Sequence, residues 1–526
     1  MKLDELTEYL DYKDLINFKN VDITGISYNS KTTKKGDIFI CLVGEHTDGH
    51  EYAQNAIDAG AAALLVERKI EGVKIPQVVV SSTRHKIADI ADRFYSSPSK
   101  GINLIGITGT NGKTTVTHLI QKILEENDQK CALIGTLGYK LSSKGEYRDA
   151  KHTTPQAPEL QATLRMIKDV EKIDNVVMEV SSHALDQNRV GGCRFNGAVL
   201  TNLTQDHLDY HITMDNYFEA KALLFKGLKE GNFAVINADD KYAERFLNVV
   251  PEGVRKYTYG VKNQADVMAK DIKFSLNGAE FTLVVAAKQL GSQAAKLDNS
   301  ENSQEQQPDK NLSTLQPFNP STDKYKVNLH MNGMFSVYNV LASVTASLAM
   351  GIDINVALKA LENVHGVAGR FEVVVKKPLV IVDYAHTPDG LENVLKSARE
   401  ITPEDGNLIC VFGCGGDRDA TKRPKMGAIA ERLADKIIIT SDNPRSEDPQ
   451  IIITDIIAGL KSVNTENVIV EPDRGSAIAL LKKIANNNDV VVIAGKGHED
   501  YQILKDKTIH FDDREEARKI FEGSVI

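Results

Sequence analysis

Residues 105–115 read Ile-Gly-Ile-Thr-Gly-Thr-Asn-Gly-Lys-Thr-Thr: an apolar run, a glycine-rich loop, then a lysine and two threonines. Apolar residues recur from Val116 to Leu124 at the spacing of one helix face, so a helix follows the loop. A strand, a glycine loop and a helix in this order form a phosphate cradle, because backbone N–H groups and the helix N-terminus face the anion. Lys113 adds a positive charge, and one threonine hydroxyl can ligate Mg²⁺. The strict phosphate-loop motif has a glycine at the position of Ile107, so the match is off by one residue. The alternative is a simple glycine turn before a surface helix. We interpret the stretch as an ATP site.

Length and composition indicate a large soluble enzyme. A chain of 526 residues is too long for one hydrophobic core, so we expect three domains. The net charge of −9 argues against nucleic-acid binding, and the five scattered cysteines, with no C-x-x-C pair, are typical of reduced thiols. The N-terminus has no apolar signal segment, and no run reaches the ~20 apolar residues of a membrane span. We therefore expect a cytoplasmic protein without membrane insertion.

Changes in composition divide the chain into three parts. We place the first at residues 1–98, the second at residues 99–367 and the third at residues 368–526. Within the second part, residues 288–323 are polar and poor in large apolar side chains. Such a segment cannot offset the entropy cost of ordering, so we expect a mobile surface insertion, with a linker between independent domains as the alternative.

In the third part, apolar strands end abruptly in polar or glycine-rich loops. The expected strands are Leu379–Val382, Leu408–Phe412, Ile437–Thr440 and Val490–Ala494. Segments with helical spacing lie between them, which predicts a parallel α/β sheet. Ligands of such sheets bind at the carboxyl ends of the strands, so we expect the four loops to share one site.

Two segments of the second part are candidates for metal binding. Glu179 ends an apolar strand, where a carboxylate is costly unless it meets a cation such as Mg²⁺; a helix-cap role is the alternative. Residues 204–211 contain two aspartates and two histidines, which could form a zinc cluster or a solvated loop. His207 could also contribute to a magnesium site, although Mg²⁺ prefers oxygen ligands.

Lys221 lies on the apolar stripe of a helix that we expect over Asn216–Leu228. Desolvation favours a neutral amine, and a neutral amine can react with CO₂ to give a carbamate, which is an anionic metal ligand. From this helix alone, the better interpretation is a lysine whose stem lies on apolar surface while its ammonium group reaches water.

Charged residues in the loops of the third part indicate an amino-acid substrate. Arg418 and Arg445 can each hold a carboxylate with two parallel hydrogen bonds, and Glu499 could accept an ammonium group. The alternative is that these side chains form surface salt bridges.

Together, these residues resemble the Mur ligase family over nearly the whole chain. The segments that carry the resemblance are Asn29–Lys31, Thr108–Thr115, Thr153–Pro155, Glu179–His183, Asp206–His211, Lys221, Asp383–Asp389, Asp442–Arg445 and Gly495–Glu499. The family uses a phosphate loop of the form T-G-T-N-G-K-T, which matches Thr108–Thr114. This form needs no glycine at the position of Ile107, so the mismatch to the strict motif is explained. The resemblance implies an N-terminal UDP-sugar-binding α/β domain, a central P-loop ATPase domain and a C-terminal Rossmann-like domain.

The resemblance also implies roles for individual residues. Catalytic roles are implied for Lys113, Glu179, His207 and Lys221, and metal ligation for Thr114, Glu179, His207 and carbamylated Lys221. ATP contacts are implied at Gly109, Thr110, Asn111, Gly112, Lys113, Thr114, Thr115, Asn339, Arg370 and Asp383. A UDP-N-acetylmuramoyl-dipeptide would bind at Ser30, Thr153, Thr154, Ser181, Gln187 and Arg189. Diaminopimelate would bind at Arg418, Asp442, Asn443, Pro444, Arg445, Gly495 and Glu499.

The family members most like this chain add meso-2,6-diaminopimelate to UDP-N-acetylmuramoyl-L-alanyl-D-glutamate in cytoplasmic peptidoglycan precursor synthesis. The resemblance implies ATP as co-substrate, Mg²⁺ as cofactor, an acyl phosphate intermediate and closure of the third domain around Val364–Arg370. The sequence Asp442-Asn443-Pro444-Arg445 favours diaminopimelate over L-lysine, because Arg445 can pair with the second carboxylate. We expect a monomer. The alternatives are an L-lysine-adding ligase, a folylpolyglutamate synthetase and a P-loop nucleotide switch protein that needs no amino-acid pocket.

Overall fold

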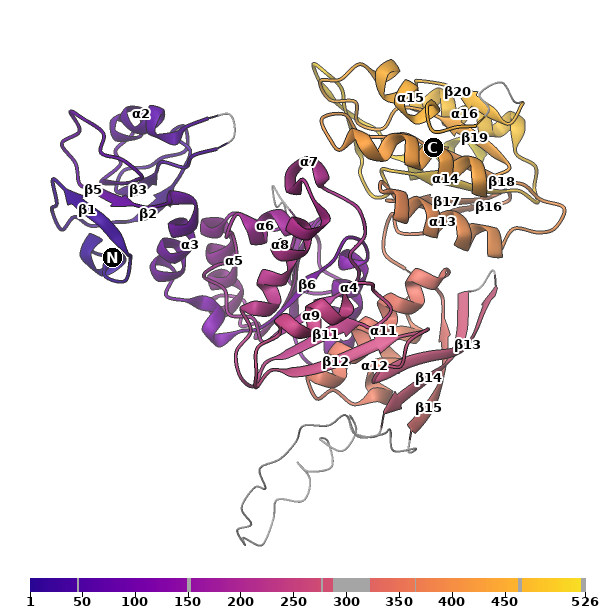
Figure 1. The fold of residues 1–526 in the computed structure, drawn as a ribbon, viewed down its shortest axis with the longest axis horizontal. Helices are drawn as coiled ribbons and strands as arrows, with labels where there is room; N and C mark the ends of the chain where they lie inside the picture. The colour runs from indigo at the N-terminus through magenta and orange to yellow at the C-terminus, as the bar shows by residue number, and fades with distance from the viewer. Residues whose placement is uncertain are drawn as a thin grey trace, which may run out of the picture.

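Three α/β units follow one another along the chain (Figure 1). The computed structural model describes residues 1–44, 47–148, 153–275, 278–286, 322–364, 366–461 and 466–521. In Figure 1 the indigo N-terminal unit and the orange-to-yellow C-terminal unit lie on either side of the central unit. The prediction of three α/β domains is confirmed, whereas the boundaries that we place at residues 98 and 367 stay a prediction.

The N-terminal unit has one sheet of order β1-β5-β4-β3-β2, in which β1 is antiparallel to β5 and the other pairs are parallel. The strands are β1 Tyr12–Ile16, β2 Gly25–Ser27, β3 Asp37–Ile40, β4 Ala63–Val66 and β5 Gln77–Val80. The helices are α1 Leu3–Thr7, η1 Gly49–Tyr52, α2 Ala53–Asp58 and α3 Thr83–Phe94, with the turn η2 Pro98–Gly101 leading into the central unit. Helix α3 packs against α5 of the central unit.

The central unit is built on a sheet of order β15-β14-β13-β12-β11-β10-β6-β9-β7-β8. Its strands are β6 Asn103–Thr108, β7 Cys131–Gly135, β8 Gly138–Lys140, β9 Asn175–Glu179, β10 Gly197–Leu200, β11 Phe233–Asn237, β12 Arg255–Gly260, β13 Val267–Ser275, β14 Gly278–Ala286 and β15 Thr322–Leu329. Its helices are α4 Lys113–Glu126, α5 Ala157–Asp169, α6 Ser182–Asp186, α7 Leu208–His211, α8 Met214–Lys226, α9 Ala243–Val249, α11 Met334–Ala349 and α12 Ile354–Glu362.

Apolar side chains of β6 alternate between the two faces of this sheet, as the strand period requires. Ile105 and Ile107 belong to the core that α4 and α11 cover, and Leu104 belongs to the core on the opposite face. Burial on both faces fixes the register of β6 and therefore the position of the phosphate loop that follows it.

We predict a polar tract at residues 288–323. Its residues 288–321 lie outside the described residues. Strands β14 and β15 on either side of it pair antiparallel, with Ala286 opposite Thr322. Both ends of the tract therefore belong to one sheet, and the alternative of a linker between independent domains is wrong. Asp323, which we assign to the tract, is already part of β15.

The C-terminal unit has a sheet of order β16-β17-β21-β18-β19-β20, parallel except for β16. Its strands are β16 Glu372–Lys376, β17 Leu379–Asp383, β18 Leu408–Phe412, β19 Lys436–Ile439, β20 Val468–Val470 and β21 Val490–Ala494, followed by the hairpin β22 Tyr501–Ile503 and β23 Thr508–His510. Its helices are α13 Pro388–Glu400, η4 Ala420–Lys422, α14 Arg423–Leu433, α15 Pro449–Ile457, α16 Arg474–Ile484 and α17 Asp513–Phe521.

The four strands predicted in this unit are confirmed as β17, β18, β19 and β21, and they are neighbours in the sheet. Because β17, β21, β18 and β19 are parallel, their carboxyl ends meet at one edge. The loops that follow them therefore lie together. Among the described helices, we find no segment whose length and hydropathy would suit a membrane span.

Candidate active site

The phosphate loop between β6 and α4 is held by the end of β10. A side chain at Gly109, where φ is +147°, would place Cβ 1.8 Å from Thr201 Oγ1, so only glycine fits. Thr110 N donates to Asn202 O at 2.9 Å, and Asn111 N donates to Asn202 Oδ1 at 2.9 Å. These bonds fix the loop before any ligand binds.

Two lysine side chains converge on one carbonyl oxygen of this loop. Lys113 Nζ donates to Gly109 O at 2.8 Å, and Lys221 Nζ, from α8, donates to the same oxygen at 2.9 Å. Burial first, and then the like charge of Lys113, lower the pKa of Lys221 well below the usual lysine value. Lys221 is 1% exposed, so the alternative in which its ammonium group reaches water is wrong.

The helix that carries Lys221 begins earlier than predicted. Helix α8 spans Met214–Lys226 rather than Asn216–Leu228, because Thr213 caps its N-terminus by accepting a bond from Asn216 N at 3.2 Å.

Glu179 ends β9 and lies against the first turn of α4. Its Oε2 accepts a hydrogen bond from Thr114 Oγ1 at 3.1 Å and one from Thr136 Oγ1 at 3.1 Å. The carboxylate is 1% exposed, as expected for a group that needs a specific partner. Helix α6 is instead capped by Ser181 Oγ, which accepts from Ala184 N at 3.2 Å, so the helix-cap alternative for Glu179 is wrong.

Residues 204–211 do not form a solvated loop. Asp206 and His211 are buried, and His211 Nε2 lies 2.9 Å from Ser182 Oγ. His207 has a φ of +55°, its Nε2 lies 3.2 Å from Asp206 Oδ2, and burial lowers its pKa to about 3. In the described ranges no three His, Cys, Asp or Glu side chains are arranged to hold a metal ion, so the zinc alternative is wrong there.

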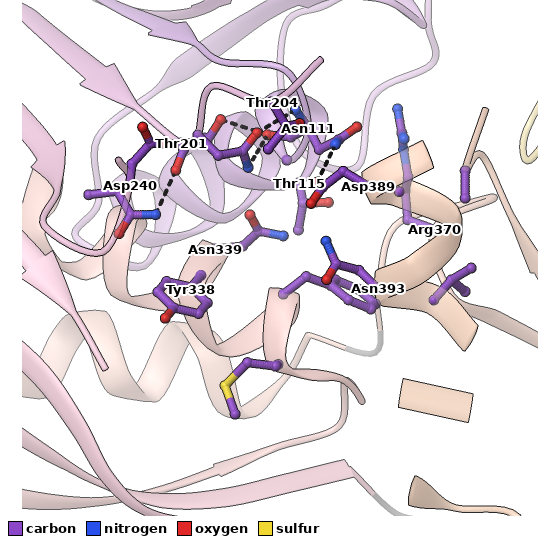
Figure 2. Close-up of a pocket in the computed structure, with 18 of the residues that line it drawn as sticks. Asn111, Thr115, Thr201, Thr204, Asp240, Tyr338, Asn339, Arg370, Asp389 and Asn393 are labelled. Carbon is purple, nitrogen blue, oxygen red and sulfur yellow. Dashed lines mark hydrogen bonds between the residues drawn. The ribbon is translucent and has the colours of Figure 1, made fainter. Parts of the chain in front are cut away.

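A cavity of about 280 Å³ lies between the central and C-terminal units (Figure 2). Six residues predicted to contact ATP line it: Asn111, Gly112, Thr115, Asn339, Arg370 and Asp383. Asn111 Nδ2 donates to Asp389 Oδ2 at 3.0 Å, which joins the phosphate loop to α13 across the boundary between the units. The cavity therefore has one wall from each unit.

Close packing positions the cavity residues of the central unit, and ring stacking and hydrogen bonds position those of the C-terminal unit. Gly112, at φ +87°, lies so close to Asn339 that an added Cβ would be 2.4 Å from Asn339 Oδ1. The Arg370 guanidinium stacks 4.3 Å above the Tyr384 ring and donates to Thr114 Oγ1 at 3.3 Å. Asp383 Oδ2 accepts from Phe371 N at 2.7 Å, and burial raises the pKa of this carboxyl.

Five residues predicted to hold the sugar-linked dipeptide form one hydrogen-bonded network beside Glu179. They are Thr153, Thr154, Ser181, Gln187 and Arg189. Thr154 Oγ1 donates to Glu179 O at 2.8 Å, Arg189 donates to Thr154 O at 3.1 Å, and a second Arg189 nitrogen donates to Gln187 Oε1 at 2.7 Å.

A groove of about 1110 Å³ continues from this network toward the third unit. Its lining includes Arg84 from the N-terminal unit, Gln187 from the central unit and Arg418 from the C-terminal unit. Ser30 lies after β2 in the N-terminal unit and does not line this groove. The structure thus gathers five of the six residues predicted for this substrate, and leaves Ser30 apart from them.

The residues predicted to hold an amino acid lie on three neighbouring loops, which follow β18, β19 and β21. Gly495, at φ +118°, packs against Asp442, and an added Cβ would lie 2.3 Å from Asp442 Oδ2. Asn443 Nδ2 donates to Glu499 Oε2 at 2.9 Å. Pro444 is buried between Asn443 and Arg445.

Both predicted arginines face this group of loops. Arg445 is half-buried, has a φ of +53° and donates to Gly416 O at 2.8 Å, whereas the exposed Arg418 donates to Asp417 O at 2.8 Å. Burial first, and then the like charge of Arg418, lower the pKa of Arg445. Within the described part of the chain neither guanidinium forms an ion pair with a carboxylate, so the salt-bridge alternative is wrong for these two arginines. Glu499, in contrast, forms an ion pair with Lys496 at 3.2 Å.

Several residues of the site were missed by the sequence analysis. Tyr338, Asp240 and Asn393 line the cavity between the central and C-terminal units, but they lie in ordinary helix and loop patterns that carry no signal (Figure 2). Lys496 is fully buried, and its Nζ donates to Glu499 Oε2 at 3.2 Å. A lysine between two glycines at a strand end is a signal that could have identified Lys496.

Three family descriptions match the chain in order along its length. "Mur ligase family, catalytic domain" matches residues 22–95, "Mur ligase middle domain" residues 107–347, and "Mur ligase, glutamate ligase domain" residues 369–497. A UDP-N-acetylmuramoyl-L-alanyl-D-glutamate–2,6-diaminopimelate ligase of Syntrophomonas wolfei is 44% identical over 531 residues, covering 100% of both chains. This chain belongs to the Mur ligase family. The resemblance inferred from the sequence is confirmed.

Other proteins similar to this Mur ligase support the family assignment. A ligase of the same name from Clostridium botulinum is 42% identical over 523 residues, covering 98% of each chain. A solved structure of a diaminopimelate ligase of that name has a TM-score of 0.64 and 31% identity, and covers 99% of each chain. A folylpolyglutamate synthase of Mycobacterium tuberculosis has a TM-score of 0.59 at 16% identity, covers 78% of this chain and 92% of its own, and shares the fold.

Substitution of Gly112 tests the phosphate loop of this Mur ligase. In Gly112→Ala the new Cβ would displace the Asn339 amide, so we expect ATP binding to weaken by at least about tenfold. Gly231→Ala is the matched control, because Gly231 has a similar φ of +82° and no atom within 4 Å of an added Cβ. Each variant carries backbone strain of about 1–2 kcal/mol. Calorimetric titration with ATP should separate them, and equal affinities would contradict the assignment.

Proposed function

We propose that this Mur ligase uses ATP to add meso-2,6-diaminopimelate to UDP-N-acetylmuramoyl-L-alanyl-D-glutamate, a step of peptidoglycan precursor synthesis. The observation that carries the proposal is the arrangement of three predicted binding regions on adjoining faces of the three units. The cavity between the central and C-terminal units takes Asn111, Gly112 and Thr115 from the phosphate loop, and the groove lined by Gln187 of the network is also lined by Arg418. The curated relatives that bear this name match the chain from end to end, which supports the same substrates here.

The proposed reaction proceeds by acyl activation. The γ-phosphoryl group of ATP passes to the side-chain carboxylate of the D-glutamyl residue, giving ADP and an acyl phosphate. The amine of diaminopimelate then attacks the acyl carbon, phosphate leaves, the amine loses a proton, and an amide remains. Lys113 would balance phosphate charge, while Thr110 to Thr115 hold the phosphates through the loop.

The residues around Glu179 fit a magnesium site. Mg²⁺ is usually held by one or two carboxylates together with substrate phosphates, and it needs no closed protein cage. Glu179 and Thr114 supply neighbouring oxygens 3.1 Å apart, and we infer that His207 and carbamylated Lys221 complete the protein's share of the ligands. Bound Mg²⁺ would neutralise negative charge on the transferring phosphoryl group.

The nucleotide itself would be held from both units. We infer that Asn339 contacts the adenine, and that Arg370 and Asp383 contact the ribose and phosphates from the C-terminal side. Because these residues come from opposite walls of the cavity, bound ATP would favour a closed arrangement of the two units. We place the bending at Val364–Arg370, in which residue 365 lies outside the described residues.

The amino-acid loops favour a substrate with two carboxylates and two amines. Arg418 and Arg445 supply two cations, and Asp442 and Glu499 supply two carboxylates. Diaminopimelate carries the complementary set of charges. L-lysine lacks the distal carboxylate and would leave Arg445 unpaired, at a cost of about 1–3 kcal/mol.

An amino-acid panel tests this proposal. The purified chain is supplied with ATP, magnesium and UDP-N-acetylmuramoyl-L-alanyl-D-glutamate, together with meso-diaminopimelate, L-lysine or no amino acid. We expect phosphate release and a UDP-linked tripeptide, seen by mass spectrometry, with diaminopimelate alone. Phosphate release that ignored both the amino acid and the sugar-linked peptide would instead identify a nucleotide switch.

Removal of Lys221 tests the carbamate. We expect Lys221→Ala to abolish ligation, because an anionic metal ligand is lost, and a small carboxylate such as acetate to restore part of the activity. Lys226→Ala is the matched control, since Lys226 is an exposed lysine on the same helix that pairs with Glu219 at 2.7 Å. Full turnover by Lys221→Ala would remove the carbamate from the mechanism.

Removal of Arg445 tests the specificity. We expect Arg445→Ala to raise KM for diaminopimelate by about 10–100-fold, the loss of a charge-assisted hydrogen-bond pair, and to leave KM for ATP within about twofold. Arg432→Ala, an exposed arginine of α14 paired with Glu392 at 3.1 Å, should change neither constant. An equal rise in both Michaelis constants for Arg445→Ala would count against a role in amino-acid recognition.

A further inference from the structure

Arg474 is a buried cation beneath the amino-acid loops that none of the proposed substrate contacts uses. It is the first residue of α16, and its side chain is 0% exposed. Its Nε donates to Asp513 Oδ1 at 2.7 Å and a terminal nitrogen donates to Asp513 Oδ2 at 2.6 Å. Asp513 begins α17 and is also 0% exposed, so this is a bidentate ion pair shielded from water.

The other guanidinium hydrogens bind one carbonyl oxygen at the end of β21 and one just beyond the end of β19. One terminal nitrogen of Arg474 donates to Ser441 O at 3.2 Å, and the other donates to Ala494 O at 3.0 Å. Ser441 lies two residues beyond the end of β19 and directly precedes Asp442, while Ala494 ends β21 and directly precedes Gly495. Asp442 and Gly495 belong to two of the amino-acid loops. Because the guanidinium is planar and rigid, it fixes the separation of these two carbonyls.

The two loops are in close contact just beyond these carbonyls. An added Cβ on Gly495 would lie 2.3 Å from Asp442 Oδ2, and Asn443 Nδ2 lies 2.9 Å from Glu499 Oε2. A small change in the separation of the strand ends would therefore move both predicted substrate carboxylates, Asp442 and Glu499. Strand β18 lies between β19 and β21, so the bridge spans three neighbouring strands of the sheet.

A buried ion pair is weak evidence for a stabilising role. Burial of an ion pair costs several kcal/mol of desolvation, and well-packed apolar residues in its place are often as stable or more stable. An apolar pair would bury the same volume, but it could not hold two strand-end carbonyls at a fixed distance. The hydrogen bonds that Arg474 donates to Ser441 O and Ala494 O therefore hold the backbone next to the amino-acid loops in place.

We propose that Arg474, oriented by Asp513, is a positioning residue that sets the spacing of the loops beginning at Asp442 and Gly495, and thereby the affinity for the amino-acid substrate. The proposal rests on the proposed function in one respect only, namely that an amino acid binds these loops. It makes no assumption about which amino acid binds.

Steady-state kinetics of two variants test the proposal. Arg474→Lys keeps the charge but loses the planar fork, and Asp513→Asn keeps the shape but loses the charge that orients the fork. For each we expect KM for the amino acid to rise by at least about tenfold, while KM for ATP and for the UDP-linked dipeptide stay within about twofold. Assays are run well below the melting temperature of each variant, so that stability does not enter.

Asp489→Asn is the matched control. Asp489 is 1% exposed in the same unit, and accepts from Asn407 N at 2.7 Å and from Asn486 N at 2.8 Å at the opposite ends of β18 and β21. It should lower the melting temperature but change no Michaelis constant. If Asp489→Asn raised KM for the amino acid as much as Asp513→Asn does, the effect would be general loosening of the sheet and the proposal would be wrong.

The outcomes separate this proposal from the proposed function. If the wild-type chain used L-lysine instead of diaminopimelate, the proposed substrate would be wrong, and the same variants would be measured with L-lysine. If Arg474→Lys did not fold, Asp513→Asn would decide, because it removes one charge with little change in volume. Unchanged KM for the amino acid in a folded Asp513→Asn or Arg474→Lys enzyme would overturn the positioning role.

Discussion

The carbonyl oxygen of Gly109 accepts hydrogen bonds from two lysine side chains, the half-buried Lys113 at 2.8 Å and the buried Lys221 at 2.9 Å. Two like charges held so near each other repel, and burial removes the hydration that would offset the repulsion. The site is relieved by an anion, by loss of a proton from Lys221, or by conversion of Lys221 into a carbamate. Each of these three changes lowers the repulsion between Lys113 and Lys221.

The cavity that we propose for ATP is lined by residues of two units, so ATP bound there would depend on their relative position. Several described contacts across the boundary are polar: Asn111 with Asp389 at 3.0 Å, Arg370 with Thr114 at 3.3 Å and Lys425 with Gln205 at 2.6 Å. An apolar contact also crosses it, because Phe335 packs against Phe371. Polar contacts of this kind between domains allow movement more readily than a large apolar interface does. A ligand that binds both walls therefore supplies part of the energy that holds the units together.

In the C-terminal unit, a parallel sheet brings loops that are distant in sequence to one edge. Arg418, Asp442 and Gly495 follow three strands, β18, β19 and β21, that are neighbours in space. The sheet fixes where the loops begin, but it leaves their spacing open to small shifts. Arg474 restricts these shifts by bonding at once to Ala494 O at the end of β21 and to Ser441 O just beyond the end of β19.

Local sequence determined much of this protein by itself. The phosphate loop, the four strands of the third unit and their polar loops could all be predicted, because each depends on contiguous residues whose spacing reflects strand or helix geometry. Where two interpretations of a side chain differ in which distant residues it contacts, the local sequence could not decide between them. Only the tertiary structure decided that the Lys221 side chain is buried against Gly109, that Glu179 meets Thr114, and that Arg474 spans two strand ends. The physical reason is that burial and hydrogen-bond partners are set by residues far away in the chain, whereas periodicity is set by near neighbours.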